Sequence, residues 1–168
     1  KLIARIDSKL QTYLLKNRLK EFGLFSYPLL GSDVSKMKEI KDADYIYIHW
    51  ALGGFLNISN FEQLAKLGKP VIFFLHDMWA ITGGCHHSFT CEKDTSHCSN
   101  CHVCPKDKHR DLSFKGFEKK LSFYSKYNNL YFISPSNWLY ECIRQSFLTK
   151  TKPVFYIPNL LDTSLYKS

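Results

Sequence analysis

Short hydrophobic runs alternate with amphipathic stretches along most of the chain. Four runs rich in Val, Ile, Phe and Tyr are typical of β-strands: residues 45–50, 71–75, 130–133 and 154–157. Three stretches between them carry apolar residues at helical spacing: residues 60–67, 112–127 and 136–147. Strands that alternate with helices through short turns predict parallel strands joined by right-handed crossovers. We therefore expect an α/β domain with a Rossmann-like, open, mostly parallel sheet and helices on both faces.

Another helical pattern opens the chain. Residues 3–22 carry apolar residues close to a 3.6-residue period, and Gly23 stands where a C-terminal cap belongs. We expect this amphipathic helix to pack its apolar face on the core. The alternative is a basic helix that lies on a membrane surface. Residues 33–41 fit a second, short helix that begins at Ser32 or Asp33.

Residues 80–109 show no periodicity, and a loop of this length is usually functional or cross-linked. The loop holds five of the six cysteines, at Cys85, Cys91, Cys98, Cys101 and Cys104. Two adjacent C-x2-C pairs can direct thiolates at one tetrahedral metal ion. We expect this Cys-rich insertion to hold a structural zinc ion through Cys85, Cys91, Cys98 and Cys101. Disulfides, free thiols, and ligation by Cys104 or the loop histidines are alternatives. No catalytic metal is expected, because the loop offers ligands in excess.

Histidines follow two of the predicted strands. His49 ends the first run, and His76 with Asp77 comes directly after the second. In α/β sheets, ligands bind beyond the carboxyl ends of the strands. We expect His76 to hydrogen-bond or deprotonate a substrate hydroxyl, with His49 contacting the substrate. Asp77 would orient His76 or cap the turn that follows. The alternative is that these are structural histidines.

Other positions are candidates for substrate contacts. Trp79 could stack on a sugar, although an aromatic residue in the core is the commoner case. Gly53 and Gly54 would let backbone amides approach a ligand closely. Ser136 lies at a predicted helix N-terminus beyond a strand, where it could bind an anion or a hydroxyl. Ordinary helix capping explains Ser136 equally well.

Composition adds less than the pattern does. The 168 residues suffice for one domain with a substantial core, and 45% hydrophobic residues argue against disorder. The net charge of +8 suggests acidic partners or simply a basic, solvated surface. Two alternative functions follow: a zinc-stabilised nucleic-acid-binding module, or a non-catalytic scaffold on an anionic membrane surface. Nucleic acid is the weaker partner, because no recognition helix stands at zinc-finger spacing.

A series of short motifs carries a family resemblance. The motifs are Asp44-Tyr-Ile-Tyr-Ile-His-Trp, Gly53-Gly-Phe-Leu, Leu75-His-Asp-Met-Trp, Thr82-Gly-Gly-Cys-His, Cys98-x-x-Cys101, Pro135-Ser-x-Trp138-Leu and Ile157-Pro-Asn-x-x-Asp162. Together they resemble the amino-terminal domain of bacterial family 4 GT-B glycosyltransferases, of the capsular and colanic-acid-like exopolysaccharide type. The similarity covers nearly the whole chain.

The resemblance implies transfer of a sugar, with retention and without a catalytic metal, to a lipid-linked saccharide acceptor. A carboxyl-terminal domain would hold most of the nucleotide-sugar donor, and this chain would be the acceptor-side half of the GT-B fold. His76 would face the reacting sugar, and Ser136 and Trp138 would belong to a substrate-binding element. A cytoplasmic protein, peripheral on the inner face of the plasma membrane, is implied as well.

The chain also departs from the family pattern. The first strand expected before Lys1 and the donor-binding domain expected after Ser168 are missing, and Leu160 stands where a glycine is usual. We therefore expect residues 1–168 to be one acceptor-side domain, a fragment that is inactive alone.

Overall fold

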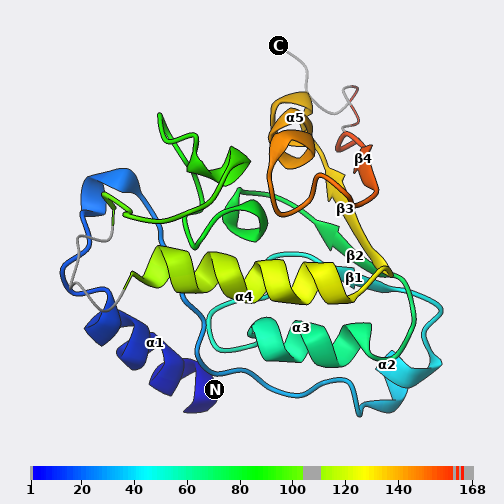
Figure 1. The fold of residues 1–168 in the computed structure, drawn as a ribbon. Helices are drawn as coiled ribbons and strands as arrows, with labels where there is room; N and C mark the ends of the chain where they lie inside the picture. The colour runs from blue at the N-terminus through cyan, green and yellow to red at the C-terminus, as the bar shows by residue number, and fades with distance from the viewer. Residues whose placement is uncertain (1, 104–110, 161, 163, 165–168) are drawn as a thin grey trace.

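The computed structural model describes residues 2–103, 111–160, 162 and 164, and its centre is a four-stranded parallel sheet (Figure 1). The strand order is β1-β2-β3-β4. The strands are β1 (Ile46–Ile48), β2 (Val71–Phe74), β3 (Leu130–Ser134) and β4 (Val154–Tyr156). All three pairings are parallel, with Ile46 beside Val71 and Val71 beside Leu130. The predicted α/β class and parallel sheet are confirmed.

Five α-helices accompany the sheet in the described residues. They are α1 (Leu2–Leu14), α2 (Lys38–Asp42), α3 (Ile58–Ala65), α4 (Leu112–Lys126) and α5 (Asn137–Gln145). Short 3-10 turns occur at η1 (Lys20–Phe22), η2 (Trp79–Ile81) and η3 (Lys93–Thr95). Side chains cap three helices: Asn57 forms a capping box on α3, Asp111 caps α4, and Ser136 caps α5.

The expectation of helices on both faces is wrong for the described residues. The core packs α3, α4 and α5 against one face of the sheet, where Phe73, Phe132 and Ile143 are buried together (Figure 1). The physical reason is the strand order, which advances in one direction so that right-handed crossovers fall on one side. On the opposite face, Tyr47 and Phe155 are each 49% exposed.

Helix α1 is shorter than predicted and is oriented differently. It ends at Leu14, because the chain then turns so that the Leu19 amide donates to the Val103 carbonyl. Its fully buried residue is Asp7, whose carboxylate accepts hydrogen bonds from the amides of Leu29 and Leu30. The apolar side faces outward, so the prediction that this side packs on the core is wrong.

The Cys-rich loop folds back onto α4 and α5, and its residues 104–109 lie outside the described part. Gly83 and Gly116 allow the closest approach, since a Cβ on Gly116 would lie 2.0 Å from the Gly83 carbonyl oxygen. The Phe147 amide donates to the Asp94 carbonyl, which ties the loop to the end of α5. None of the helices in the described ranges is long and apolar enough to cross a membrane.

Candidate functional site

Two histidines meet at the carboxyl end of the sheet, as the sequence predicted. The Nδ1 atom of His49 lies 3.0 Å from the Nε2 atom of His76, so one ring donates a hydrogen bond to the other. The rings stack at an angle of 26°, and both contact Phe74 on the exposed face of the sheet. Parallel register places the ends of β1 and β2 side by side, which explains the pairing.

Asp77 does not orient His76, so the first of its two predicted roles is wrong, whereas the second, capping the turn that follows, agrees with its hydrogen bond from the Trp79 amide. The Asp77 Oδ2 atom lies 2.7 Å from Nδ1 of His86, and the other carboxylate oxygen accepts from the Trp79 amide. The second ring nitrogen of His86 lies 2.8 Å from Oγ of Ser26. Asp77, His86 and Ser26 therefore form a continuous hydrogen-bonded relay.

The direction of the hydrogen bonds along this relay depends on the His86 tautomer. Burial of the Asp77 carboxylate opposes ionisation, but the hydrogen bond and charge of His86 outweigh it and hold the pKa of Asp77 below its ordinary value. When His86 is neutral and carries its proton on Nδ1, the ionised Asp77 accepts that N–H and Nε2 is a hydrogen-bond acceptor. The Ser26 hydroxyl can then donate to His86, and its own lone pairs remain available.

A backbone pairing brings Ser26 and His86 together from distant parts of the sequence. Phe25 and Cys85 form an antiparallel bridge, the Ser26 amide donates to the Gly84 carbonyl, and the His86 amide donates to the Leu24 carbonyl. The Trp79 indole donates to the Ser26 carbonyl at 3.0 Å. The relay is thus held by the backbone on both sides.

A cleft of about 510 Å³ opens beside this relay, and apolar side chains that include Leu15, Leu24 and Phe25 line it together with polar ones. One wall is the α1 face formed by Ser8, Gln11 and Thr12, and the other includes Ser26, Trp50 and Gly53. The Trp50 side chain is 53% exposed, and its ring lies 6.1 Å from that of His86. Hydroxyls, an amide and an exposed aromatic face are the groups that bind polar, ring-shaped ligands.

Of three residues predicted to contact the substrate, Trp79 and Gly54 have structural roles and Gly53 lines the cleft. Trp79 is 6% exposed and packs in the core, so the sugar-stacking role is wrong for it. Gly54, at a φ of 80°, allows α1 to pack closely, because a Cβ there would lie 2.5 Å from the Ala4 Cα. Gly53 lines the cleft, and nothing lies within 4 Å of the place of its Cβ.

The predicted substrate residues on α5 lie outside the 510 Å³ cleft. Ser136 accepts a hydrogen bond from the Leu139 amide at 3.2 Å, which is ordinary N-capping. Trp138 is 54% exposed, and its ring stacks on His87 at 5.4 Å. This stack connects α5 to the segment that follows His86.

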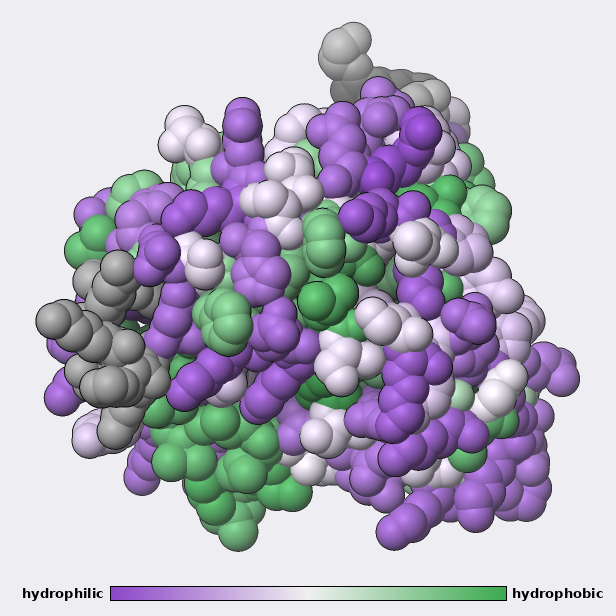
Figure 2. All heavy atoms as spheres, in the orientation of Figure 1, coloured by the Kyte–Doolittle hydropathy of each residue, from purple (hydrophilic) through white to green (hydrophobic). Residues whose placement is uncertain are grey.

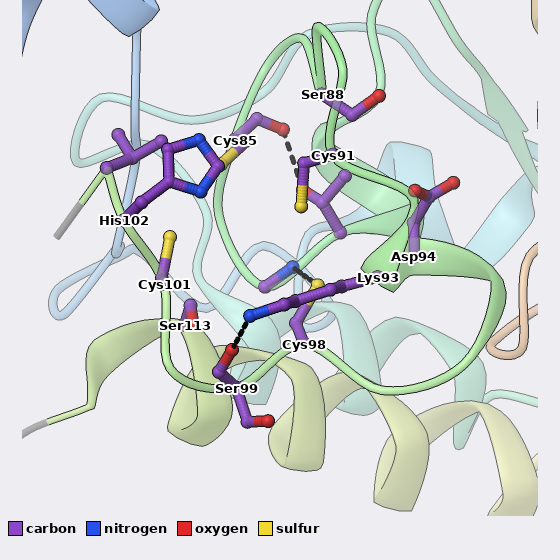
Figure 3. Close-up of a pocket in the computed structure, with 13 residues that line it drawn as sticks. Cys85, Ser88, Cys91, Lys93, Asp94, Cys98, Ser99, Cys101, His102 and Ser113 are labelled. Carbon is purple, nitrogen blue, oxygen red and sulfur yellow. Dashed lines mark hydrogen bonds between the residues drawn. The ribbon is translucent and has the colours of Figure 1, made fainter.

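The cysteines predicted to bind zinc line one small pocket (Figure 3). These are Cys85, Cys91, Cys98 and Cys101, around a cavity of about 20 Å³ that can hold one ion or one water. The Gly83 amide donates to the Cys98 sulfur at 3.2 Å. Among the residues described, no three His, Cys, Asp or Glu side chains are already grouped closely enough to hold a metal ion. The donor chemistry therefore fits zinc, while binding would require the thiols to move together.

The pocket adjoins a buried lysine. Lys120 of α4 is 1% exposed, and its ammonium donates to the carbonyls of Trp79 and Thr82 while lying 3.7 Å above the Trp79 ring. Burial lowers the pKa of Lys120 to about 7, and it raises the pKa of the Cys98 thiol to about 12. Both shifts result from the low-dielectric interior that α4 and the loop share.

Three residues of the site were not predicted from the sequence: Ser26, Trp50 and His86. His86 stood among the alternate zinc ligands, and Trp50 belonged to a strand, but Ser26 gave no signal. Comparison with protein-family models, with curated proteins and with solved structures found no match for this chain.

Proposed function

We propose that this chain is the acceptor side of a retaining glycosyltransferase, which transfers sugar from a nucleotide-sugar donor to a saccharide. One observation carries the proposal: the Asp77–His86–Ser26 relay borders a cleft whose lining includes hydroxyl groups and an exposed tryptophan. Sugars present hydroxyls at their edges and C–H groups on their faces. The hydroxyls of the cleft and the Trp50 ring match these two surfaces.

In this proposal the relay handles the proton of the acceptor hydroxyl. That hydroxyl donates to Ser26 Oγ, whose own proton is shared with Nε2 of His86. As the acceptor oxygen bonds to the anomeric carbon of the donor sugar, the bond from that carbon to the nucleotide diphosphate breaks and the diphosphate leaves. The acceptor proton passes to Ser26, and the Ser26 proton passes to His86. Asp77 stabilises the imidazolium that results, because its carboxylate lies 2.7 Å from Nδ1.

The His49–His76 pair lines a separate pocket of about 30 Å³ that shares Trp50 with the cleft, and in this proposal it supplies a second polar edge. These rings lie at the ends of β1 and β2, next to Asp77 in the chain, and both are exposed. The family resemblance gives His76 a place facing the reacting sugar. One member of the pair can donate a hydrogen bond outward while the other accepts, which suits a sugar hydroxyl.

The cleft also carries positive charge. Lys16 and Arg18 line it near Thr12. A saccharide linked to a lipid through phosphate would place anionic oxygens near these cations. The arrangement therefore favours a lipid-linked acceptor, as the resemblance implies.

Titration of the isotopically labelled chain with octyl glycosides, followed by NMR, tests the proposal. Octyl β-glucoside and octyl β-galactoside should shift the Trp50 indole signal and those of residues 24–26, with affinity in the range of about 1 mM. Nucleotide sugars should leave these signals unchanged. Trp138→Ala serves as a matched control, because it removes an exposed tryptophan away from the cleft. Unchanged cleft signals at saturating glycoside would refute the proposal.

A second candidate function follows from the same geometry. A serine, a histidine and an aspartate in hydrogen-bonded order are also the parts of a serine hydrolase. Both functions need a substrate to reach Ser26 Oγ, and the Ser26 residue is 8% exposed. Labelling of Ser26 by a fluorophosphonate, together with ester hydrolysis that is lost in Ser26→Ala, would establish the hydrolase and displace the transferase.

The cysteine pocket has a structural role in this proposal: a zinc ion bound by Cys85, Cys91, Cys98 and Cys101 stabilises the loop. Four thiols on one small cavity support it, because thiolates are the ligands of structural zinc. Zinc would fix the loop that carries His86, and it would take no part in the sugar transfer.

A further inference from the structure

His49 and His76 form an exposed pair of imidazoles on two neighbouring strands. His49 comes directly after β1, and His76 comes two residues after the end of β2. The parallel register holds these two strand ends side by side (Figure 1). Both rings also contact Phe74. Because the sheet fixes the backbone positions from which the side chains start, the two rings face each other in a defined geometry.

No carboxylate bonds either ring in the described part of the chain. His86 and His97 differ in this respect, since each has a ring nitrogen 2.7 Å from an acidic side chain. Asp77, the neighbour of His76 in the sequence, bonds His86 and the Trp79 amide instead. A metal ion that binds the facing nitrogens of the pair therefore has no ion pair to displace.

The separation of the two facing nitrogens matches two positions on one metal ion. Nδ1 of His49 lies 3.0 Å from Nε2 of His76. Imidazole nitrogens bind Zn²⁺ at about 2.0–2.1 Å. Two bonds of this length at a right angle place their nitrogens about 2.9 Å apart, and at a tetrahedral angle about 3.3–3.4 Å apart. The observed distance lies between these values, so a small rotation of the exposed rings would direct both lone pairs at one ion.

Replacement of the His–His hydrogen bond by a metal ion conserves protons. In a neutral pair, one facing nitrogen carries a proton and the other accepts it. Metal binding needs both lone pairs, so this proton moves to the other nitrogen of its own ring, with solvent as the carrier. Both imidazoles remain neutral, and the hydrogen bond between them is the one interaction that the ion replaces.

We propose that His49 and His76 together bind a divalent transition-metal ion, Cu²⁺ or Ni²⁺ by preference. Both ions accept imidazole ligands and favour bonds at right angles, which the short separation of the nitrogens suits. Among the residues described, no third His, Cys, Asp or Glu side chain is grouped with this pair. The other positions of the ion are therefore open to water or to an external ligand.

This metal site is separate from the cysteine pocket and does not depend on the proposed sugar transfer. Trp50 and Asp77 line the same pocket as the pair, so the ion would stand beside the relay without replacing any of its hydrogen bonds. In the proposed function, a sugar hydroxyl contacts the same two nitrogens. Metal and sugar would then exclude each other at this edge.

Calorimetric titration of the untagged chain with the Ni²⁺ complex of nitrilotriacetate tests the proposal. This chelator leaves two adjacent positions of the ion open, which is the arrangement that a pair of imidazoles needs. The complex is too large for the cysteine pocket of about 20 Å³. It is also hydrophilic, so the apolar side chains exposed over α1, at the lower left of Figure 2, do not attract it. The parent chain should bind one complex with a Kd of about 10 μM.

His49→Ala and His76→Ala should each weaken this binding about tenfold or more, because a single imidazole remains. The matched control is His87→Ala, which removes an exposed histidine elsewhere and should bind like the parent chain. The Ca²⁺ complex of the same chelator should not bind, because calcium takes oxygen ligands. This second control separates ligation from attraction between the anionic chelate and the basic chain.

NMR of the labelled parent chain locates the ion without any substitution. Paramagnetic Ni²⁺ broadens the signals of nearby residues, so the signals of residues 48–50 and 74–77 should weaken first. Broadening centred elsewhere would overturn the proposal, as would parent-like binding by either His→Ala variant or equal binding of the calcium complex. Glycoside titration uses no metal, so failure here leaves the proposed function to its own test.

Discussion

The buried Lys120 makes the stability of this domain depend on pH in a way that can be calculated. Its ammonium has two carbonyl partners and the Trp79 ring, and burial lowers the pKa of Lys120 from 10.5 to about 7. Charges on Cys98, Cys85 and Asp77 oppose this shift and do not cancel it. The folded state therefore favours the neutral amine more than the unfolded state does.

The sign follows from proton binding. Between pH 7 and 10.5 the unfolded chain holds the Lys120 proton and the folded chain increasingly does not, so stability rises with pH. One pKa unit corresponds to about 1.4 kcal/mol. Because half of the folded molecules are protonated at pH 7, the expected gain from pH 7 to 9 is about 2 kcal/mol. Above pH 9 the Cys98 thiol, whose pKa is raised to about 12, acts in the opposite direction.

Urea unfolding followed by circular dichroism measures this gain, with a reducing agent and a chelator present so that the thiols stay metal-free. The parent chain should gain about 2 kcal/mol between pH 7 and 9, at a constant dependence on urea. Lys120→Met keeps most of the side-chain volume and removes the titrating group, so its stability should change little over the same range. An equal gain in Lys120→Met, or a flat profile in the parent chain, would refute the reasoning.

Three further predictions concern the relay, the loop and the helix beneath it. Asp77→Asn should change the His86 tautomer in nitrogen NMR and weaken glycoside binding about tenfold, because the imidazole loses its anionic partner. The reduced chain should take up one zinc ion by elemental analysis; Cys98→Ser should abolish uptake, and a parent chain without zinc would remove the metal proposal. Gly116→Ala should lower the free energy of unfolding by about 1–3 kcal/mol in urea titrations, although alanine is the better helix former, whereas the exposed Ser122→Ala on the same helix should have little effect.

The sheet was predictable because its strands are local, apolar and separated by clear turns. Each of the four predicted runs matches an observed strand to within two residues at either end, and the short connections forced a parallel arrangement. The prediction of helices on both faces depended on a reversal of strand order, which a periodicity argument cannot supply. Without that reversal, the crossovers remain on one face.

The wrong prediction of which side of α1 is buried has a different cause. Hydrophobic periodicity located the helix but could not determine which side is buried. That depends on Asp7, whose carboxylate satisfies two backbone amides of a segment more than twenty residues away. A buried carboxylate that bonds amides outweighs the preference of Ile6 or Leu10 for the interior, because an unpaired buried amide is costly.

The candidate site was half predictable for a similar reason. His49 and His76 follow strands, so the topology alone brings them together. Ser26 and His86 meet only because residues 24–26 pair with residues 84–86. A short β-bridge of this kind has no local sequence pattern from which it could be predicted. Asp77 was therefore assigned to its neighbour in sequence, His76, although its actual partner is nine residues further along.

The relay and the cysteine pocket share one backbone segment, so a structural change in the pocket is transmitted to the relay. Cys85 precedes His86 directly, Thr82 and Gly83 line the pocket, and Lys120 bonds the Thr82 carbonyl from below. A metal ion in the pocket would thus restrain the backbone that places His86 against Ser26. Loss of the metal should loosen the relay before the sheet unfolds, because β1 to β4 draw their stability from the separate core beneath α3 and α4. If the chain binds sugar as proposed, the cysteines would affect that binding only by positioning His86 and Ser26.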